Sequence, residues 1–416
     1  MREVTTLILF LITFCACAQT DRCGLVTDKY QVKFESWISS RRAVATAQET
    51  PTVYRIPVVV HILHHGDSLG NGYNFPQDRI INQIKTLNED FRRQEGTPGF
   101  NNHPKGGDVL VEFALAQTDP DGDPTNGIVR VDMTTVNPGS NTGDIITLCS
   151  RYSYWDPDRY LNVWCMDIGL PPGLFLGSSR FPTTDLEGLD NQGPQPDGDG
   201  VFINALNFGS GDTLTDPHYN LGRTLTHEVG HFLGLLHTWG SINNSRQCDA
   251  YSDHCDDTPP TPVATEGCPA VGPVACDGRR VMIENYMDGT YDACMNIFTH
   301  DQIARMRTVL ENSPHRKSLT ASPTINRPLI TGVDDAKSVI SLYPNPATDK
   351  VYVSLGQGKG NVVITAYSLL GQVLFEEKKM DENRRIDIYL QGIHEKMIIV
   401  VIETEGKVGR YLLEVR

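Results

Sequence analysis

The pattern of apolar residues predicts a layered α/β arrangement over residues 55–206. Residues 55–64 form an almost continuous apolar run, which is typical of a buried strand. Residues 76–93 repeat apolar side chains at helical spacing, as in Ile80, Ile84 and Leu87. Further strands are expected at residues 109–116, 160–166 and 201–206, with an edge strand at 177–182. A helix between buried strands predicts a twisted α/β sheet.

The pattern changes along the second half of the chain. Residues 238–283 show little periodicity and are rich in Cys, Pro, Asp and Gly, so they need covalent or metal cross-links to hold one shape. Residues 298–310 are typical of a helix, with Thr299 as N-cap and Gln302 at the capping-box position. Residues 316–335 lack a period and are expected to be a linker. Short apolar runs then recur at roughly ten-residue intervals through residues 336–416, which predicts a small all-β sandwich.

The N-terminus has the features of a secretory signal peptide over residues 1–18. Arg2 supplies the positive end, residues 7–14 are apolar, and Ala16-Cys17-Ala18 fits the small-x-small cleavage pattern. A lipoprotein cleavage before Cys17 is an alternative that the preceding residues match poorly. The apolar run is too short to span a bilayer, and no later segment reaches about 18 continuous apolar residues, so no transmembrane helix is expected.

Length, composition and charge narrow the class of protein. The 416 residues exceed one typical domain of about 100–200 residues, so two or three units are expected. Hydrophobic residues make up 39% and charged residues 21%, which suits a packed core rather than a largely disordered chain. The net charge of −15 argues against a nucleic-acid partner. It favours cationic substrates and calcium, although a solvated acidic surface without a partner is the commoner case.

The segment His-Glu-Val-Gly-His-Phe-Leu-Gly-Leu-Leu-His at residues 227–237 indicates a zinc site. His227 and His231 are four apart, so on a helix both imidazoles project from one face and reach one Zn²⁺ at about 2.0–2.1 Å. Gly234 lies where the helix should end, and a positive φ there turns the chain so that His237 becomes a third ligand. Three protein ligands plus a water are typical of catalytic zinc, whereas structural sites have four ligands.

Glu228, next to the first histidine, is placed to take a proton from the zinc-bound water rather than to bind the metal. The competing interpretation is an amphipathic core helix whose histidines fall in register by chance. Five specified positions within eleven residues disfavour that interpretation.

Ten cysteines are present, and eight remain after the expected signal cleavage. Five of the eight fall between residues 248 and 294, and in an exported protein such a cluster is typical of disulfides. A second zinc site is the alternative, but the spacing lacks paired Cys-x-x-Cys knuckles.

The zinc motif and residues 285–294, Asn-Tyr-Met-Asp-Gly-Thr-Tyr-Asp-Ala-Cys, together resemble the metzincin metalloproteases. Residues 295–306 and the Cys-Asp-Asp-Thr-Pro segment at 255–259 resemble the pappalysin family within that clan. The resemblance covers about residues 55–311. It implies an α+β, metzincin-like catalytic domain, with a twisted sheet and long helices over an irregular lower half. It also implies a methionine turn beneath the zinc, which matches Met287.

The same resemblance implies roles for residues around the zinc motif. Asp292 matches the acidic residue at the foot of the S1′ pocket, and a carboxylate there favours Arg, or Lys, just after the scissile bond. A structural carboxylate beside Cys294 is the alternative. Structural calcium is implied, with Asp253, Asp257 and Thr258 as candidate ligands, against the alternative of plain turn residues.

Family spacing implies the disulfides Cys248–Cys276 and Cys268–Cys294. Cys255 is then left over, and Cys149 with Cys165 is a further candidate pair, since connectivity does not follow from sequence. One position departs from the family. Its members carry a tyrosine two residues after the turn methionine that helps hold the tetrahedral intermediate, whereas this chain has Gly289, with Tyr291 two residues further on.

Arg22-Cys23-Gly24 resembles the cysteine switch of related zymogens. A thiolate from Cys23 can occupy the water position on zinc and block catalysis. Residues 19–54 are therefore expected to be an inhibitory pro-segment, removed near Tyr54–Arg55, with the protease domain at 55–315. A disulfide from Cys23 to another cysteine is the alternative.

The last domain, residues 336–416, resembles the C-terminal sorting domain of Bacteroidetes type IX secretion cargo. Residues 341–350 and 367–372 carry the resemblance, while the final eight residues depart from the usual ending. It implies type IX secretion machinery as a partner and export through the periplasm to a secreted or cell-surface location. The function implied is a secreted zinc endopeptidase acting on proteins or peptides. A surface binding or adhesion protein that keeps zinc without turnover is the alternative, which Gly289 favours and Glu228 disfavours.

Overall fold

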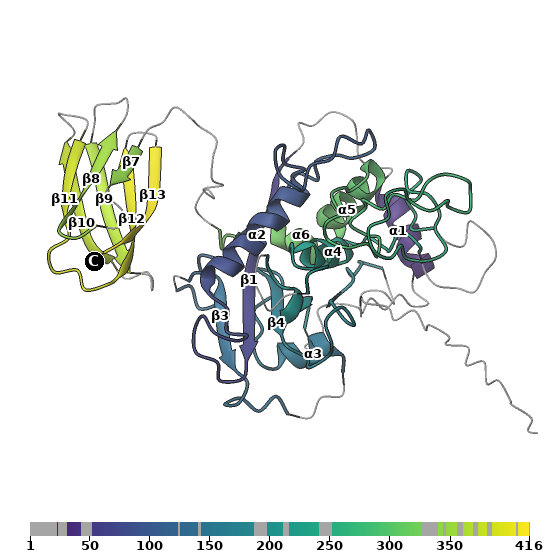
Figure 1. The fold of residues 1–416 in the computed structure, drawn as a ribbon, viewed down its shortest axis with the longest axis horizontal. Helices are drawn as coiled ribbons and strands as arrows, with labels where there is room; N and C mark the ends of the chain where they lie inside the picture. Colours follow the sequence, from purple (N-terminus) through teal and green to yellow (C-terminus); the bar gives the residue numbers. More distant parts are fainter. Residues whose placement is uncertain are drawn as a thin grey trace, which may run out of the picture.

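The computed structural model describes most of the chain (Figure 1). The described residues are 23, 31–42, 52–123, 125–139, 143–186, 198–210, 216–240, 252–325, 340–343, 347–355, 361–368, 373–380, 385–404 and 407–415. The expected signal peptide and the second half of the expected linker, residues 326–335, lie outside these residues.

A mixed sheet forms the upper part of the first unit. Its strands are β1 (Tyr54–His64), β2 (Val111–Leu115), β3 (Ile128–Asp132), β4 (Leu161–Met166), β5 (Gly177–Ser179) and β6 (Gly200–Asn204). The order is β2-β1-β4-β6-β5, and β3 pairs with the later half of β1. All pairings are parallel except that of the edge strand β5 with β6. The expected strands are therefore present, and β3 is an addition.

Helices cover both faces of this sheet. On one face, α2 (Gln77–Phe91) and α4 (Arg223–Phe232) pack against alternate residues of the central strands, such as Val58, Val60 and Val163. On the other face, the short helix α3 (Ile145–Ser150) packs with Trp164 and Phe202. Because both faces are covered, the central strands are apolar throughout, which explains their almost continuous hydrophobic runs.

Three more helices complete the unit: α1 (Gln31–Arg42), α5 (His300–Asn312) and α6 (Pro314–Thr320). Thr299 and Gln302 form the expected capping box at the start of α5. Helix α6 extends beyond the expected domain end at residue 315 into the expected linker. Its Arg316 is 1% exposed, pairs with Asp199 at 2.6 Å and donates to the Phe232 carbonyl at 2.8 Å. The Ser/Pro/Thr-rich composition concealed this short helix because buried polar contacts, rather than an apolar stripe, hold much of it.

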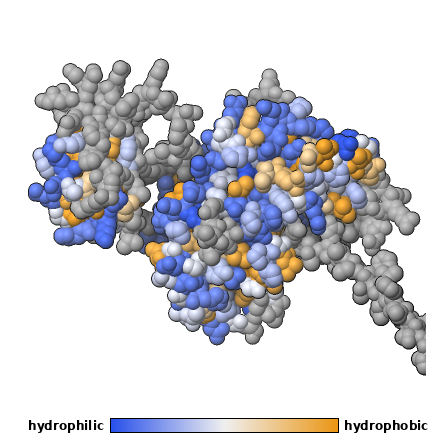
Figure 2. Space-filling model, in the orientation of Figure 1, coloured by the Kyte–Doolittle hydropathy of each residue, from blue (hydrophilic) through white to orange (hydrophobic). Residues whose placement is uncertain are grey.

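The lower half, residues 252–299, is built from turns without helices or strands. Figure 2 shows hydrophilic side chains over most of the visible surface, with separate apolar patches. Among the described residues, no helix has the length and apolar character needed to cross a membrane.

A second unit consists of antiparallel strands β7 (Ile340–Tyr343), β8 (Lys350–Leu355), β9 (Asn361–Ser368), β10 (Val373–Met380), β11 (Arg385–Tyr389), β12 (Met397–Thr404) and β13 (Lys407–Glu414). One sheet has the order β10-β9-β12-β13 and the other β11-β8-β7. Alternate residues such as Val351, Ile364 and Val400 form its own core. The expected β-sandwich is therefore confirmed.

Candidate active site

Helix α4 and the turn that follows it position the histidines of the zinc motif. Gly222 caps the helix with a left-handed backbone, and the helix ends at Phe232. Gly234 has φ of +88°, a conformation that glycine adopts at little cost. Its N–H donates to the His231 carbonyl at 2.8 Å, which closes the last turn. The chain then reverses and brings His237 back beside His231, with ring centroids 4.5 Å apart.

Four potential metal ligands converge at this point. The ligand atoms of Cys23, His227, His231 and His237 all lie within 4.8 Å of one another, and all four residues are buried. This is the one such cluster of His, Cys, Asp and Glu among the described residues. Tetrahedral zinc accepts this mixture of nitrogen and sulfur ligands, so the residues present suit the metal.

Backbone carbonyls hold the first two imidazoles in the orientation that a metal ligand requires. His227 Nδ1 lies 2.7 Å from the Tyr286 carbonyl oxygen, and His231 Nδ1 lies 2.7 Å from that of Leu235. Each carbonyl accepts a proton from Nδ1, which leaves Nε2 with its lone pair. The two Nε2 atoms face each other at 3.1 Å. The Nε2 atom of His237 is buried without a hydrogen-bond partner, as expected of an atom that binds a metal.

Burial keeps all three imidazoles neutral. It lowers the pKa of His227 to about 4. Burial, with the neighbouring imidazoles as a smaller cause, holds the pKa of His231 and His237 well below the usual value. Neutral imidazole is the form that binds a metal, so no proton has to leave at neutral pH.

Met287 lies directly beneath α4. A Cβ atom at Gly230 would lie 2.5 Å from the Met287 sulfur, so only glycine fits there without movement. The Met287 carbonyl also accepts the Thr238 N–H at 3.1 Å. The methionine turn therefore supports both the helix and the segment that follows His237.

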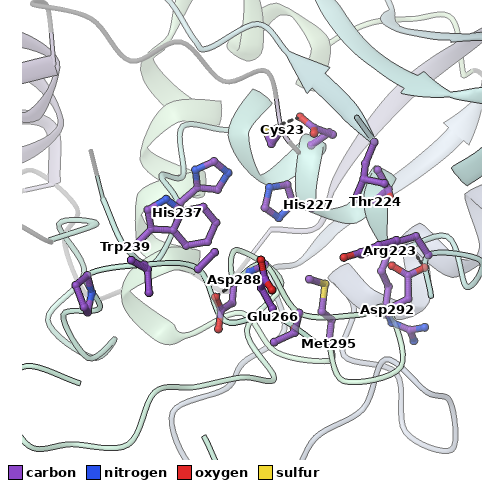
Figure 3. Close-up of a pocket in the computed structure, with 18 residues that line it drawn as sticks. Cys23, Arg223, Thr224, His227, His237, Trp239, Glu266, Asp288, Asp292 and Met295 are labelled. Atoms are coloured by element: carbon purple, nitrogen blue, oxygen red, sulfur yellow. Dashed lines mark hydrogen bonds between the residues drawn. The ribbon is translucent and has the colours of Figure 1, made fainter. Parts of the chain in front are cut away.

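Glu228 and Cys23 contact each other beside the histidine cluster, and Cys23 lies above His227 in Figure 3. Glu228 is 1% exposed, and the Cys23 thiol lies 3.6 Å from its Oε2 atom. The backbone of Cys23 also forms a parallel bridge with Gly177 at the edge strand β5. This arrangement puts the thiol beside both the histidines and the carboxylate.

A pocket of about 130 Å³ extends from these residues toward Asp292. His237 and Trp239 lie at one end of the view in Figure 3, and Arg223 and Asp292 at the other. The Asp292 carboxylate is buried and accepts the backbone N–H groups of Leu221 at 2.8 Å and Arg223 at 3.2 Å. Burial raises the pKa of Asp292 to about 6, although these N–H groups act in the opposite direction.

The pocket includes residues that the sequence interpretation did not single out. Trp239 stacks on His237 with ring centroids 4.1 Å apart. Thr224 lines the pocket, and its buried hydroxyl has no hydrogen-bond partner. Thr224 is one helical turn before Glu228, so helical spacing alone was a usable signal for it. The position of Trp239 depends on the chain reversal, and no pattern in the sequence predicts it.

Close packing around position 289 leaves little room for a side chain. A Cβ atom there would lie 2.8 Å from the Cβ atom of Ala264. Tyr291 stacks on His218 with ring centroids 4.1 Å apart and does not line the pocket.

Two of the three candidate calcium ligands contact each other, and the third contacts the start of α5. Thr258 donates to Asp253 at 2.7 Å, whereas Asp257 accepts the Asp301 N–H at the start of α5 at 3.0 Å. The buried atoms Asp253 Oδ2 and Asp257 Oδ1 each lack a hydrogen-bond partner. Burial raises the pKa of Asp253 to about 7.

The structure contains the disulfide Cys268–Cys294. Cys276 is also disulfide-bonded, while its expected partner Cys248 lies outside the described residues. Cys149 and Cys165 are both buried thiols, so the candidate pair between them is not formed, and Cys255 is a buried thiol as well. Cys23 is not part of a disulfide either.

Comparison with known proteins agrees with this geometry. Residues 149–311 match the M43 peptidase family, described as pregnancy-associated plasma protein-A, and residues 341–408 match a secretion system C-terminal sorting domain. The chain is 40% identical to extracellular metalloprotease 1 of Coccidioides posadasii over 60% of this chain and 74% of that protein. It is 38% identical to an extracellular metalloprotease of Arthroderma benhamiae over 74% and 90% of the two chains.

Two solved structures from Tannerella forsythia are similar in fold. A promirolysin variant is 32% identical, with a TM-score of 0.58 over 72% of this chain and 97% of that chain. Mature mirolysin in complex with a cleaved peptide is 34% identical, with a TM-score of 0.53 over 65% and 97% of the two chains.

The fold and the histidine cluster define a metzincin-like zinc metalloendopeptidase followed by a sorting domain. Within that class, the chain belongs to the pappalysin family of extracellular metalloproteases. It is a secreted hydrolase of peptide bonds, and its tail is of the type IX secretion kind.

Proposed function

We propose that His227, His231 and His237 hold the zinc ion and that Glu228 is the general base. The observation that carries this proposal is the convergence of the three neutral imidazoles beside a buried carboxylate. When bound, zinc supplies Lewis-acid chemistry at the scissile carbonyl. Glu228 accepts a proton from the attacking water and passes it to the leaving amine nitrogen.

We further propose that the enzyme cuts before Arg, or Lys. Asp292 supports this specificity because its buried carboxylate lines the same pocket as Glu228 and His227. An Arg side chain that enters from the scissile bond would meet this carboxylate with its planar guanidinium, which suits a bidentate pair.

Residues 19–54 are proposed to keep the precursor latent, with Cys23 at the position of the catalytic water. The distance of 3.6 Å between the thiol and Glu228 supports this role. The promirolysin match covers 72% of this chain and the mature form 65%, which also favours a precursor arrangement. Cleavage before Arg55 requires the start of β1 to leave the sheet, since Tyr54 N–H donates to the Leu110 carbonyl at 2.9 Å.

We also propose that calcium stabilises the lower half and that the protein is exported through the periplasm. The unpartnered buried oxygens of Asp253 and Asp257 favour a calcium ion in this region, with Thr258 as a further oxygen donor. The sorting domain favours a two-step export in which a signal peptide over residues 1–18 precedes type IX secretion.

One experiment tests both the base and the specificity. Activated parent enzyme, the Glu228→Ala variant and the Asp292→Asn variant are incubated with a denatured protein mixture, and the cut sites are mapped by mass spectrometry. We expect Glu228→Ala to retain zinc and lose at least about 10²-fold in activity, because no other group accepts the proton. We expect Asp292→Asn to cut without preference for Arg. Near-native turnover without Glu228, or cuts before apolar residues in the parent, would contradict the respective assignment.

A further inference from the structure

The pro-segment contacts the catalytic unit at a second place besides Cys23. Helix α1 contacts α5 of the catalytic unit (Figure 1). Phe34, Trp37 and Ile38 are 4%, 2% and 3% exposed, and they pack against Val309 and Phe181. The helix therefore packs on a surface of the catalytic unit that includes Phe181, Arg305 and Val309, and this surface is called the groove below.

An ion pair between a buried arginine and a partly buried glutamate also joins α1 to this groove. Arg305 of α5 is 1% exposed, and its two terminal nitrogens donate to the Glu35 carboxylate at 2.5 and 2.6 Å. Its Nε atom donates to the Gly234 carbonyl at 2.6 Å. At the end of the groove, Trp37 donates from its indole nitrogen to Asp185 at 2.6 Å, and Arg41 pairs with the same carboxylate.

The groove also touches the turn that positions the third zinc ligand. A Cβ atom at Gly234 would lie 3.6 Å from the Phe34 ring, so α1 covers the residue at which the chain reverses. The Arg305 guanidinium thus joins the Glu35 carboxylate on one side to the Gly234 carbonyl on the other. Binding of α1 in the groove therefore contacts the turn that holds His237 in place.

We propose that this groove is an independent binding site for an amphipathic helix, and that its ligand is α1 of the pro-segment. The site requires two apolar aromatic side chains three residues apart with an acidic residue between them, as Phe34, Glu35 and Trp37 provide. The excised segment stays bound by α1 after the chain is cut, so that cleavage and release are separate steps of activation. The inference rests on the proposed pro-segment role of residues 19–54.

The fragment is expected to stay bound because none of the contacts of α1 depends on an intact chain or on zinc. Cutting the backbone changes an intramolecular contact into a bimolecular one, which lowers the effective concentration of the helix but removes no contact. The complex therefore becomes sensitive to dilution. Its affinity is also reduced by the cost of re-forming a short helix before rebinding.

The test uses the full chain with Glu228→Ala, which prevents self-digestion. A recognition sequence for an unrelated site-specific protease is inserted at one point within residues 43–51, and the chain is cleaved there. Size-exclusion chromatography at falling protein concentration then measures the fraction of the N-terminal fragment that stays with the catalytic unit. We expect the fragment to co-elute at high concentration and to dissociate on dilution.

Three variants separate the groove from the cysteine. Glu35→Gln should raise the dissociation constant by roughly 30-fold or more, because Arg305 stays buried without its carboxylate. Lys33→Gln, at an exposed position of the same helix, should leave it within about twofold. Cys23→Ala should retain the fragment. All three changes lie in the detachable segment, so the core of the catalytic unit is unaltered.

Two results would overturn the proposal: a parent fragment that separates at every concentration, or release by Cys23→Ala as complete as that by Glu35→Gln. The readout needs no peptidase activity. A separate assay compares the peptidase activity of the precursor with native Glu228 before and after the cut. Equal activities, together with a fragment that stays bound, would contradict the latency role of residues 19–54 but not the binding of α1 to the groove.

Discussion

The specificity proposed for Asp292 should depend on pH. Burial raises its pKa to about 6, so the carboxyl group loses its charge as the pH falls through that value. The ratio of kcat/KM for two peptides that differ only in Arg or norleucine after the cut should therefore fall roughly tenfold between about pH 8 and pH 5, as the charged fraction of the carboxyl group falls by that factor. The ratio cancels titration of groups that serve both peptides. In Asp292→Asn the ratio should be low and independent of pH, and a persistent dependence there would assign the effect to another group.

Gly230 tests the contact between the methionine turn and the helix. Gly230→Ala places a methyl group 2.5 Å from the Met287 sulfur, which forces one of the two to move. We expect a loss of about 1–3 kcal/mol in the free energy of unfolding, measured by denaturant titration of the metal-loaded protein. The double variant with Met287→Ala should be less destabilised than the sum of the two single variants. Strict additivity would mean that the two side chains do not interact.

Helix α6 belongs to the catalytic unit although it follows the expected domain end. A chain that stops after residue 315 loses Arg316 and leaves Asp199 buried without its partner, whereas a chain that stops after residue 335 keeps both. We expect the shorter chain to be destabilised by about 3–5 kcal/mol and the longer one to match the full protein. Thermal unfolding followed by peptidase assay distinguishes them. Equal melting temperatures would place the domain end at residue 315.

The turns of the lower half are the place to expect a calcium effect. Burial raises the pKa of Asp253 to about 7, and calcium binds only the deprotonated carboxylate. Without calcium, this folded-state pKa makes the protein gain stability as the pH falls from about 8 to 5; with calcium, the added stability is largest near pH 8. Differential scanning calorimetry at both pH values measures it. Asp253→Asn should abolish the calcium shift, and Asp256→Asn, at an exposed neighbouring position, should preserve it.

At the scale of the whole molecule, the two units have separate cores. The full chain should therefore unfold in two thermal transitions, because cooperativity is a property of each packed core. Chelation of zinc and calcium should lower the transition of the catalytic unit and leave that of the β-sandwich unchanged. A single transition that shifts as one would show that the units unfold together.

The extent to which sequence predicted this molecule follows from the physics of each part. The histidines and Glu228 lie within eleven residues of one helix and turn, so local periodicity was sufficient to bring them together. Long central strands were predicted because both of their faces are buried. Helix α6 and Trp239 escaped prediction because contacts between distant segments place them. Cys23 was assigned through resemblance, and its position against Gly177 arises from pairing with a strand more than 150 residues away.

The hydrogen bonds to the imidazoles of His227 and His231 come from main-chain carbonyls of residues 286 and 235 rather than from side chains. The proton that fixes each ring is therefore specified by the path of the backbone, and a substitution at either carbonyl-bearing residue keeps the acceptor as long as the path is kept. The metal-binding form of these rings is robust to mutation of their hydrogen-bond partners. It is vulnerable instead to changes elsewhere that displace two turns of chain by a fraction of an ångström.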